Sequence, residues 1–386
     1  MVAQSAGMSR SSDVAVIGGG IIGCSAAAIL AGRGASVVLF EATGIGSGAS
    51  GRNLGAIQHP FDPVLAPLYH ASLEHYRRLA RFVERFAIPD RPVGVLMLNR
   101  DPDASRRQVQ RLRAAVPDLE VEFVDADTVA AAEPSLVPGF AACLLHTGYP
   151  IPPASATAAF SRLAAQNGAE LRVGVEAAPW IEDGEVQGVT LADGTRQSAG
   201  TVLIAAGPWS PPLHPEGALP ITRTWGVTVQ LDLGAAAPHH VIEEYEVDAV
   251  NRPLLAAART AAGEPEADPH TLFTVASAAG VSTLGSTFLP AEPDSARIAR
   301  LLIERGARYL PAIGGAPVHE VRLCARPQSG DSRPFIGPVA GVEGLFVCAG
   351  HGPWGISTGP ASAALVVDAI LNRAAIPKEL AADRRI

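Results

Sequence analysis

Residues 13–41 constrain the fold of this chain more than any other stretch. Residues 13–17 form a short apolar run that predicts a buried strand, and small and aliphatic residues at helical spacing follow. A second β-branched run then ends at an acid. Between the first strand and the helix, Gly18, Gly20 and Gly23 have the G-x-G-x-x-G spacing. This order of elements predicts a βαβ unit that binds a dinucleotide.

Each glycine of this motif has its own physical role. Gly18 permits a tight turn, Gly20 lets the backbone approach a pyrophosphate, and Gly23 allows helix and strand to pack closely. The helix N-terminus offers free N–H groups to the pyrophosphate, and Ile22 is among the expected cofactor contacts. Glu41, at the end of the second strand, would bind the ribose hydroxyls and repel a 2′-phosphate. The unit alone does not separate FAD from NAD.

Composition and charge narrow the class of protein. The 386 residues suffice for two domains with sizeable cores, and 48% hydrophobic against 18% charged residues indicates a globular chain. No apolar run reaches the roughly 18 residues of a membrane helix, so we expect no integral membrane segment. The net charge of −8 is spread out without a basic block, which argues against nucleic acid as a partner.

The cysteines point to a reducing compartment. Cys24, Cys143, Cys324 and Cys348 lack the spacing of metal ligands, so we expect no metal site and reduced thiols. The first twelve residues carry no apolar core of a signal peptide. The sequence therefore predicts a cytoplasmic protein.

A second glycine-rich stretch identifies the kind of dinucleotide. Residues 44–60 contain many glycines, with polar pairs spaced between them. Residues 48–55 (Gly-Ala-Ser-Gly-Arg-Asn-Leu-Gly) resemble the second flavin-contacting loop of the FAD-dependent D-amino-acid oxidase and glycine oxidase family. The resemblance implies FAD, with Ser50, Arg52 and Asn53 as cofactor contacts and His59 close to the site.

The C-terminal part carries the family's second signature. Arg326-Pro, Asp331 and Pro334-x-Ile-Gly resemble its arginine-proline, Asp, Pro-x-Ile-Gly pattern, and residues 344–359 read as a strand, a glycine-rich loop and a helix start. A helix N-terminus at the flavin would stabilise negative charge on the reduced ring. The resemblance covers the cofactor half of the chain. It implies further cofactor contacts at Val175, Gly207, Arg326, Gly350, Gly352, Trp354, Gly355 and Ile356.

The resemblance and the order of predicted elements give an α/β fold, α+β overall, with two domains. A Rossmann-like FAD-binding domain would comprise residues 1–80, 146–215 and 320–386. A substrate domain with a mixed sheet would comprise residues 81–145 and 216–319. Within these, hydrophobic spacing predicts helices at 64–87, 103–115, 127–132, 154–166, 294–309 and up to 371, and strands at 93–98, 120–124, 170–175, 186–191, 201–206, 227–231, 271–277 and 281–288.

The implied chemistry is oxidation of the CH–NH bond of an amino acid or secondary amine to an imine, by hydride transfer to flavin N5. This reaction needs no strong base, but it needs a cation for the substrate carboxylate, and a bidentate arginine suits that role. Arg326 occupies the position that the family uses. His351 and His59 are candidates for a direct catalytic role, with holding of the backbone as the alternative.

Other side chains have open roles. Arg223, Trp225, Tyr245 and Arg252 are candidates for walls of the substrate site, against packing or surface roles. Asp331 follows a glycine and is expected to fix its loop rather than act as a base.

Two departures from the family's patterns affect the flavin. In the sarcosine oxidase branch a cysteine carries a covalent flavin, and Cys324 stands at the matching place; a small buried thiol is the alternative, and we expect a non-covalent flavin. The chain has a single lysine, Lys378, in its tail. No lysine is thus available to activate oxygen near the flavin. This does not exclude oxygen as the electron acceptor, but it makes another acceptor credible.

Two rival functions fit parts of the pattern. An FAD-dependent 2-hydroxy-acid dehydrogenase would use Arg326 for the same carboxylate. A flavoprotein subunit of a larger dehydrogenase complex would keep residues 13–41 but lack Arg326 and the C-terminal signature, both of which this chain has.

Overall fold

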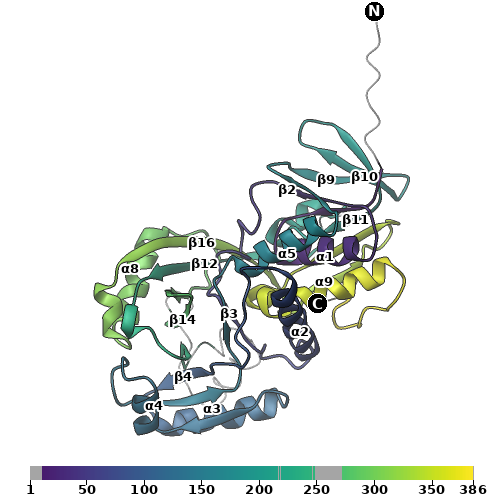
Figure 1. Cartoon of the computed structure of the whole chain (residues 1–386). Helices are drawn as coiled ribbons and strands as arrows, with labels where there is room; N and C mark the ends of the chain where they lie inside the picture. The colour runs from purple at the N-terminus through teal and green to yellow at the C-terminus, as the bar shows by residue number, and fades with distance from the viewer. Residues whose placement is uncertain (1–10, 216, 218, 246, 248–271, 386) are drawn as a thin grey trace, which may run out of the picture.

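The computed structural model describes residues 11–215, 217, 219–245, 247 and 272–385. Within this part of the chain, the strands form two eight-stranded sheets and one two-stranded sheet. Helices α1, α2, α5 and α9 gather beside the first sheet, whereas α3, α4 and α8 accompany the second (Figure 1). The expected α/β fold with a Rossmann-like unit is confirmed.

The first sheet has the strand order β17-β18-β11-β1-β2-β8. The predicted βαβ unit is β1 (Ser12–Ile17), α1 (Ile21–Gly32) and β2 (Val37–Glu41), and β1 and β2 pair in parallel. The other strands on this path are β8 (Glu170–Val173), β11 (Arg196–Ile204), β17 (Phe335–Pro338) and β18 (Leu345–Ala349), and two further strands, β10 (Glu185–Leu191) and β9 (Ala177–Glu182), extend the sheet from β11. Because β1, β2, β11 and β18 run parallel, their carboxyl ends meet at one edge of the sheet, where such folds bind ligands.

Helix α1 is buried on nearly all sides. Ten of its residues are buried, most of them small or aliphatic. It packs against β2, α5 (Ser155–Gln166) and α9 (Gly355–Ile370), so every face meets protein rather than water. Helix α2 (Ala66–Phe82) packs against α9 in turn. The expected helix over 64–87 ends earlier, at Phe82, and Arg85 has a φ of +67°, which a helix does not allow.

The second sheet has the order β16-β12-β15-β14-β13-β4-β6-β5. Its longest pair is antiparallel, β12 (Ile221–Leu231) with β16 (Val318–Ser329). The other strands are β4 (Val95–Asn99), β5 (Val121–Val124), β6 (Ala141–Leu145), β13 (Val241–Glu244), β14 (Thr274–Ala278) and β15 (Val281–Gly285). Helices α3 (Pro102–Ala115), α4 (Ala126–Ala132) and α8 (Ser295–Gly306) complete this half (Figure 1).

Several predicted elements differ from the structure in extent. The strand expected at 227–231 begins at Ile221, because β16 pairs with β12 along its whole length. The strand at 170–175 ends at Val173, where Gly174 takes a φ of +80°. The helix at 294–309 begins after Asp294, whose carboxylate accepts N–H groups of its first turn, and ends at Gly306.

Some elements were not predicted at all. Strand β9 (Ala177–Glu182) is one of these, and it forms a hairpin with β10 (Glu185–Leu191), which was predicted at 186–191; β3 (Ala56–Ile57) and β7 (Tyr149–Pro150), which pair with each other, are two more. The predicted domain border at residue 320 falls inside β16, which belongs to the second sheet. We therefore propose that this border lies after Ser329. In the described residues, no helix is long and apolar enough to cross a membrane.

Candidate active site

The glycine motif after β1 is packed too tightly for any side chain. Gly18 has a φ of +113°, and a Cβ there would lie 2.5 Å from the Ala205 carbonyl oxygen. A Cβ at Gly23 would lie 1.9 Å from the oxygen of Gly18. At Gly20 a Cβ would lie 3.1 Å from the Ser50 Oγ, so the space at the start of α1 is limited by Ser50. These backbone groups therefore need glycine, as the motif predicts.

Glu41 holds the loop that follows the motif. Its Oε2 accepts the N–H of Gly19 at 2.7 Å, and its Oε1 accepts the N–H and the hydroxyl of Thr43 at 2.8 and 2.9 Å. The carboxylate is thus at the carboxyl end of β2, beside the motif, where a ribose would meet it. Val175, another predicted contact, donates its N–H to the Glu41 carbonyl at 3.0 Å.

The second glycine-rich loop is braced against the first. The Ser50 Oγ accepts the N–H of Ile21 at 3.0 Å, at the N-terminus of α1. Asn53 donates to the Ser50 carbonyl at 2.8 Å and accepts the N–H of Gly55 at 2.8 Å. Arg52 donates to the carbonyl of Leu323 at 2.9 Å. The loop therefore runs from the α1 N-terminus to β16 of the second sheet.

Alternate residues of β16 face this loop and the start of α9. Arg322 donates to the carbonyls of Gly51 and Asn53 at 3.2 and 3.3 Å, so it fixes the flavin loop to the second sheet. Sequence reasoning assigned Arg322 no role. Its position two steps before Cys324 and four before Arg326, on the same face of one strand, is the signal that could have found it.

Arg326 is held in place by neutral groups only. Its Nη1 donates to the Thr287 carbonyl at 2.7 Å, and its Nη2 donates to the Ser286 Oγ at 2.8 Å. The Cζ lies 4.5 Å from the centre of the Phe288 ring. Burial lowers the pKa of Arg326. Among the described residues Arg326 forms no ion pair, whereas Arg305, Arg333 and Arg384 each pair with a carboxylate.

A cavity of about 1020 Å³ opens beside these residues. It is bounded by β12, the turn after β16 and the loop before α9. Its lining includes the neighbours of Arg326, namely Phe288, Thr224 and Gln328. The full lining is Leu219, Pro220, Ile221, Thr222, Thr224, Phe288, Gln328, Ser329, Gly330, Asp331, Ser332, Pro353 and Arg385. The cavity is large enough for a small organic substrate.

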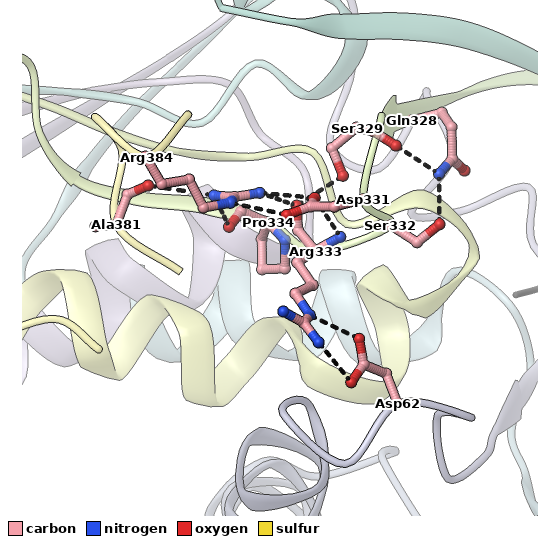
Figure 2. A network of polar contacts seen from close by, with 9 residues as sticks. All are labelled: Asp62, Gln328, Ser329, Asp331, Ser332, Arg333, Pro334, Ala381 and Arg384. Atoms are coloured by element: carbon pink, nitrogen blue, oxygen red, sulfur yellow. Dashed lines mark hydrogen bonds and ion pairs between the residues drawn. The ribbon is translucent and has the colours of Figure 1, made fainter. Parts of the chain in front are cut away.

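A network of ion pairs fixes the loop that lines this cavity (Figure 2). Arg384 donates from Nε and Nη2 to both oxygens of Asp331, each at 3.0 Å. Arg333 donates to both oxygens of Asp62, at 2.7 and 3.2 Å. The predicted loop-fixing role of Asp331 is confirmed. Sequence reasoning missed Arg384 and Asp62, because both partners lie far away in the chain.

The loop before α9 is buried and neutral. His351 is 2% exposed, burial lowers its pKa to about 3, and its Nε2 has no hydrogen-bond partner among the described residues. Gly350 and Gly352 have φ values of +93° and +52°. Trp354 is buried edge-on against Phe61 at 5.4 Å, and α9 starts at Gly355. An orphaned imidazole nitrogen beside a helix N-terminus fits a bound polar ring.

The structure does not bring His59 to this cavity. His59 is buried against Tyr69 and lines a separate cavity of about 510 Å³ beside α2. Its Nδ1 lies 2.7 Å from the Pro60 carbonyl. Burial lowers the pKa of His59. Its Nε2, like that of His351, has no hydrogen-bond partner among the described residues, so the direct role of His59 stays a prediction.

Arg223 and Trp225, the two candidates for substrate walls on β12, do not line this cavity. Thr222 and Thr224 line the cavity, whereas Arg223 and Trp225 alternate to the opposite face of the strand. Tyr245 accepts a hydrogen bond from Arg111 at 2.7 Å and so lies against α3. Arg252 lies outside the described residues.

The remaining predicted contacts fall into two groups. Ile22 is buried in α1 and Gly207 begins the short helix after β11, both near the glycine motif. Ile356 is buried in the first turn of α9, and its carbonyl accepts the hydroxyl of Tyr76 at 2.7 Å. Cys324 is buried, burial raises its pKa, and its Sγ lies 3.8 Å from the Arg52 carbonyl.

Comparisons with known proteins agree with this geometry. A glycine oxidase of Pseudomonas putida is 28% identical over 371 residues, which cover 93% of this chain and 94% of that protein. A monomeric sarcosine oxidase of Streptomyces avermitilis is 32% identical over 56% of each chain. The glycine oxidase structure of Geobacillus kaustophilus superimposes with a TM-score of 0.81 at 23% identity, over 98% of this chain and all of that one.

The family model described as FAD dependent oxidoreductase, DAO, matches residues 13–369. This match spans both sheets, the glycine motif, the flavin loop and the start of α9. The chain therefore belongs to the DAO family of FAD-dependent oxidoreductases.

Proposed function

We propose that the chain oxidises the CH–NH bond of a small carboxylated amine to an imine, with Arg326 as the anchor of the substrate carboxylate. Bound FAD would supply the acceptor for the hydride that leaves the carbon next to the nitrogen. The residues of this chain bind the cofactor and orient the substrate. The resemblance to glycine oxidases and a sarcosine oxidase supports an amine rather than a hydroxy acid as the substrate.

The observation that carries the proposal is the set of partners around Arg326. A partly buried guanidinium needs anionic partners, because an unpaired charge away from water is costly. Two of its five N–H donors bond to the Thr287 carbonyl and the Ser286 hydroxyl. The donors left over can bind a carboxylate in the bidentate manner that arginine favours. Arg326 is not itself among the lining residues, but its neighbours Phe288, Thr224 and Gln328 line the cavity, which supports a substrate site next to it.

Among the described residues around the cavity, none is poised as a strong base. Asp331 is occupied by Arg384, and His351, with its pKa near 3, is neutral at pH 7. An amine substrate supplies its own lone pair, so loss of hydride requires only that it bind unprotonated. A hydroxy acid would lose a hydroxyl proton as well and would profit from a base. This difference again favours the amine.

The cofactor contacts that we propose follow the backbone. Gly18, Gly20 and Gly23 with Ser50 would hold the pyrophosphate, and Glu41 would bind the ribose. The N-terminus of α9 and the His351 Nε2 would meet the polar edge of the flavin ring. We propose a non-covalent flavin, because the Cys324 thiol is buried with a raised pKa and so forms little thiolate at pH 7.

The electron acceptor and the compartment are further proposals. Lys378, the single lysine, is exposed in the tail and lies 4.0 Å from Glu379. We propose oxygen or a small-molecule acceptor. All four cysteines are free and buried, which supports a reducing, cytoplasmic compartment.

The test is anaerobic reduction of the flavin-loaded protein by three panels of compounds: amino acids, N-methyl amino acids and 2-hydroxy acids. Bleaching of the flavin by a member of the first two panels is expected. Reduction by hydroxy acids alone would refute the proposal. Subsequent addition of air, or of an artificial acceptor, would then identify how the reduced flavin is reoxidised.

A further inference from the structure

Gly226 lies directly against the guanidinium of Arg326. It sits in the middle of β12, opposite Cys324 and two residues from Thr224, the partner of Arg326. A Cβ at Gly226 would lie 2.5 Å from Nη2, 2.6 Å from Cζ and 2.6 Å from Nη1. Since the three distances are nearly equal, the guanidinium lies flat over the backbone of Gly226.

The backbone itself does not require glycine here. Gly226 has an extended conformation that any residue adopts, since its φ is not among the positive values. A glycine inside a long strand weakens it, so it usually marks the close approach of another group. The group that approaches is the Arg326 side chain, and not another backbone.

Other groups also hold the guanidinium. The centre of the Phe288 ring lies 4.5 Å from Cζ. The Thr287 carbonyl and the Ser286 hydroxyl fix one edge. The planar group is thus in contact with the Gly226 backbone and the Phe288 ring, and two hydrogen bonds fix its orientation.

We propose that Gly226 is a positioning residue for substrate recognition: it provides the space in which Arg326 lies flat and presents its free N–H groups to the substrate carboxylate. This inference rests on the proposed function, because it takes Arg326 as the carboxylate anchor. Carbon and nitrogen atoms that are not bonded prefer separations of roughly 3.5–4.0 Å. A methyl group at residue 226 therefore displaces the guanidinium by about 1 Å, enough to cost roughly 100-fold in a positioned reaction.

The experiment is a double-mutant cycle with Gly226→Ala and Arg326→Ala, each assayed with a carboxylate substrate and with its neutral amide. Gly226→Ala should lower kcat/KM for the acid by roughly 100-fold, mainly through KM, and leave the amide near its wild-type value. In the Arg326→Ala background the same substitution should have no further effect. Gly315→Ala, at an exposed glycine with no atom within 4 Å of its Cβ, is the control for an added methyl group.

The outcomes are distinguishable. If Arg326→Ala abolishes the preference for the acid while Gly226→Ala keeps it, the inference is wrong and the anchor stands. If Arg326→Ala keeps the preference, the carboxylate anchor is elsewhere, and both the role of Arg326 and the role of Gly226 are refuted. Should Gly226→Ala fail to fold, the double variant decides: recovery of folding supports the clash with Arg326, and failure of both variants assigns Gly226 to strand packing and overturns the proposal.

Discussion

Replacement of Arg384 by alanine tests the network that fixes the cavity loop. The Arg384 side chain is 8% exposed and that of Asp331 is 26% exposed. Besides Asp331, the guanidinium donates to the carbonyls of Pro334 and Arg333, at 2.7 and 2.6 Å. It also lies 3.8 Å from the centre of the Phe335 ring. The substitution removes all of these contacts together.

The expected loss of stability follows from the Asp331 carboxylate, which the substitution leaves without its Arg384 partner. Removing one partner of a buried ion pair costs roughly 3–5 kcal/mol, and the partial exposure of Asp331 places this pair at the low end, about 3 kcal/mol. Unfolding entropies of roughly 2.1 cal/mol/K per residue give about 0.8 kcal/mol/K for the 386 residues. If the chain unfolds as one unit, the Tm of Arg384→Ala should fall by about 4 °C.

The pH dependence supplies a second signature. Burial alone would raise the pKa of Asp331, but hydrogen bonds led by that from Arg384 lower it overall. A carboxyl group whose folded pKa is depressed stabilises the protein above its unfolded pKa of roughly 3.9. This contribution is lost as the pH falls through the folded pKa. The difference in Tm between wild type and Arg384→Ala should therefore be full at pH 7 and shrink below about pH 4.

Thermal unfolding at pH 7 and at pH 4 and below, with Arg373→Ala as the control, measures both effects. Arg373 is an exposed arginine in the same C-terminal part, and its loss should shift Tm by less than about 1 °C. Equal shifts for the two variants at pH 7 would refute the reasoning, since the network would then contribute no more than a surface charge.

Four further predictions concern the site. Arg326→Ala should weaken a carboxylate ligand relative to its amide by roughly 2–5 kcal/mol, about 30- to 5,000-fold, with FAD content unchanged; an intact preference would place the anchor elsewhere. Glu41→Ala should weaken FAD binding by roughly 1.5–3 kcal/mol in a titration, and equal affinity would make Glu41 a loop-holding residue only. Acid precipitation should release the flavin from wild type and Cys324→Ala alike, whereas colour retained only in the wild-type pellet would reveal a covalent bond. Because burial lowers the pKa of His351 to about 3, wild type should lose stability as the pH falls from about 6.5 towards 3, and His351→Asn should lose less over this range; parallel curves would contradict this.

Local features of the cofactor half could be predicted from the sequence because they depend on neighbours in the chain. The βαβ unit needs only hydrophobic spacing and three glycines, and the structure places Gly18 and Gly23 where no Cβ fits. The loop-fixing role of Asp331 could likewise be predicted locally, because Asp331 follows a glycine in a turn. Strand ends were less certain, since β12 extends to Ile221 only because β16 pairs with it.

The contacts that complete the site could not be predicted in this way. Asp62 and Arg333 are 271 positions apart, and Asp331 and Arg384 are 53 apart. Nothing in either local sequence indicates its partner. Arg223 and Trp225, two candidates for substrate walls, do not line this cavity, for a simpler reason. Side chains alternate along a strand, so an error of one residue in phase selects the opposite face, and Thr222 and Thr224 line the cavity instead.

The hydrogen-bond partners of the two arginines on β16 differ, and this difference supports the proposal that Arg326 rather than Arg322 binds the substrate. Both terminal nitrogens of Arg322 donate to the flavin loop, at the carbonyls of Gly51 and Asn53, whereas its Nε has no hydrogen-bond partner among the described residues. Arg326 has the same facing on the same strand, but its bonds to Ser286 and Thr287 leave donors unused. Because both cations lie on one face, the sheet carries positive charge where an anionic substrate and a reduced flavin would both be stabilised. Both arginines bring positive charge to this face of β16, and their hydrogen-bond partners determine which guanidinium has N–H groups left for a substrate carboxylate.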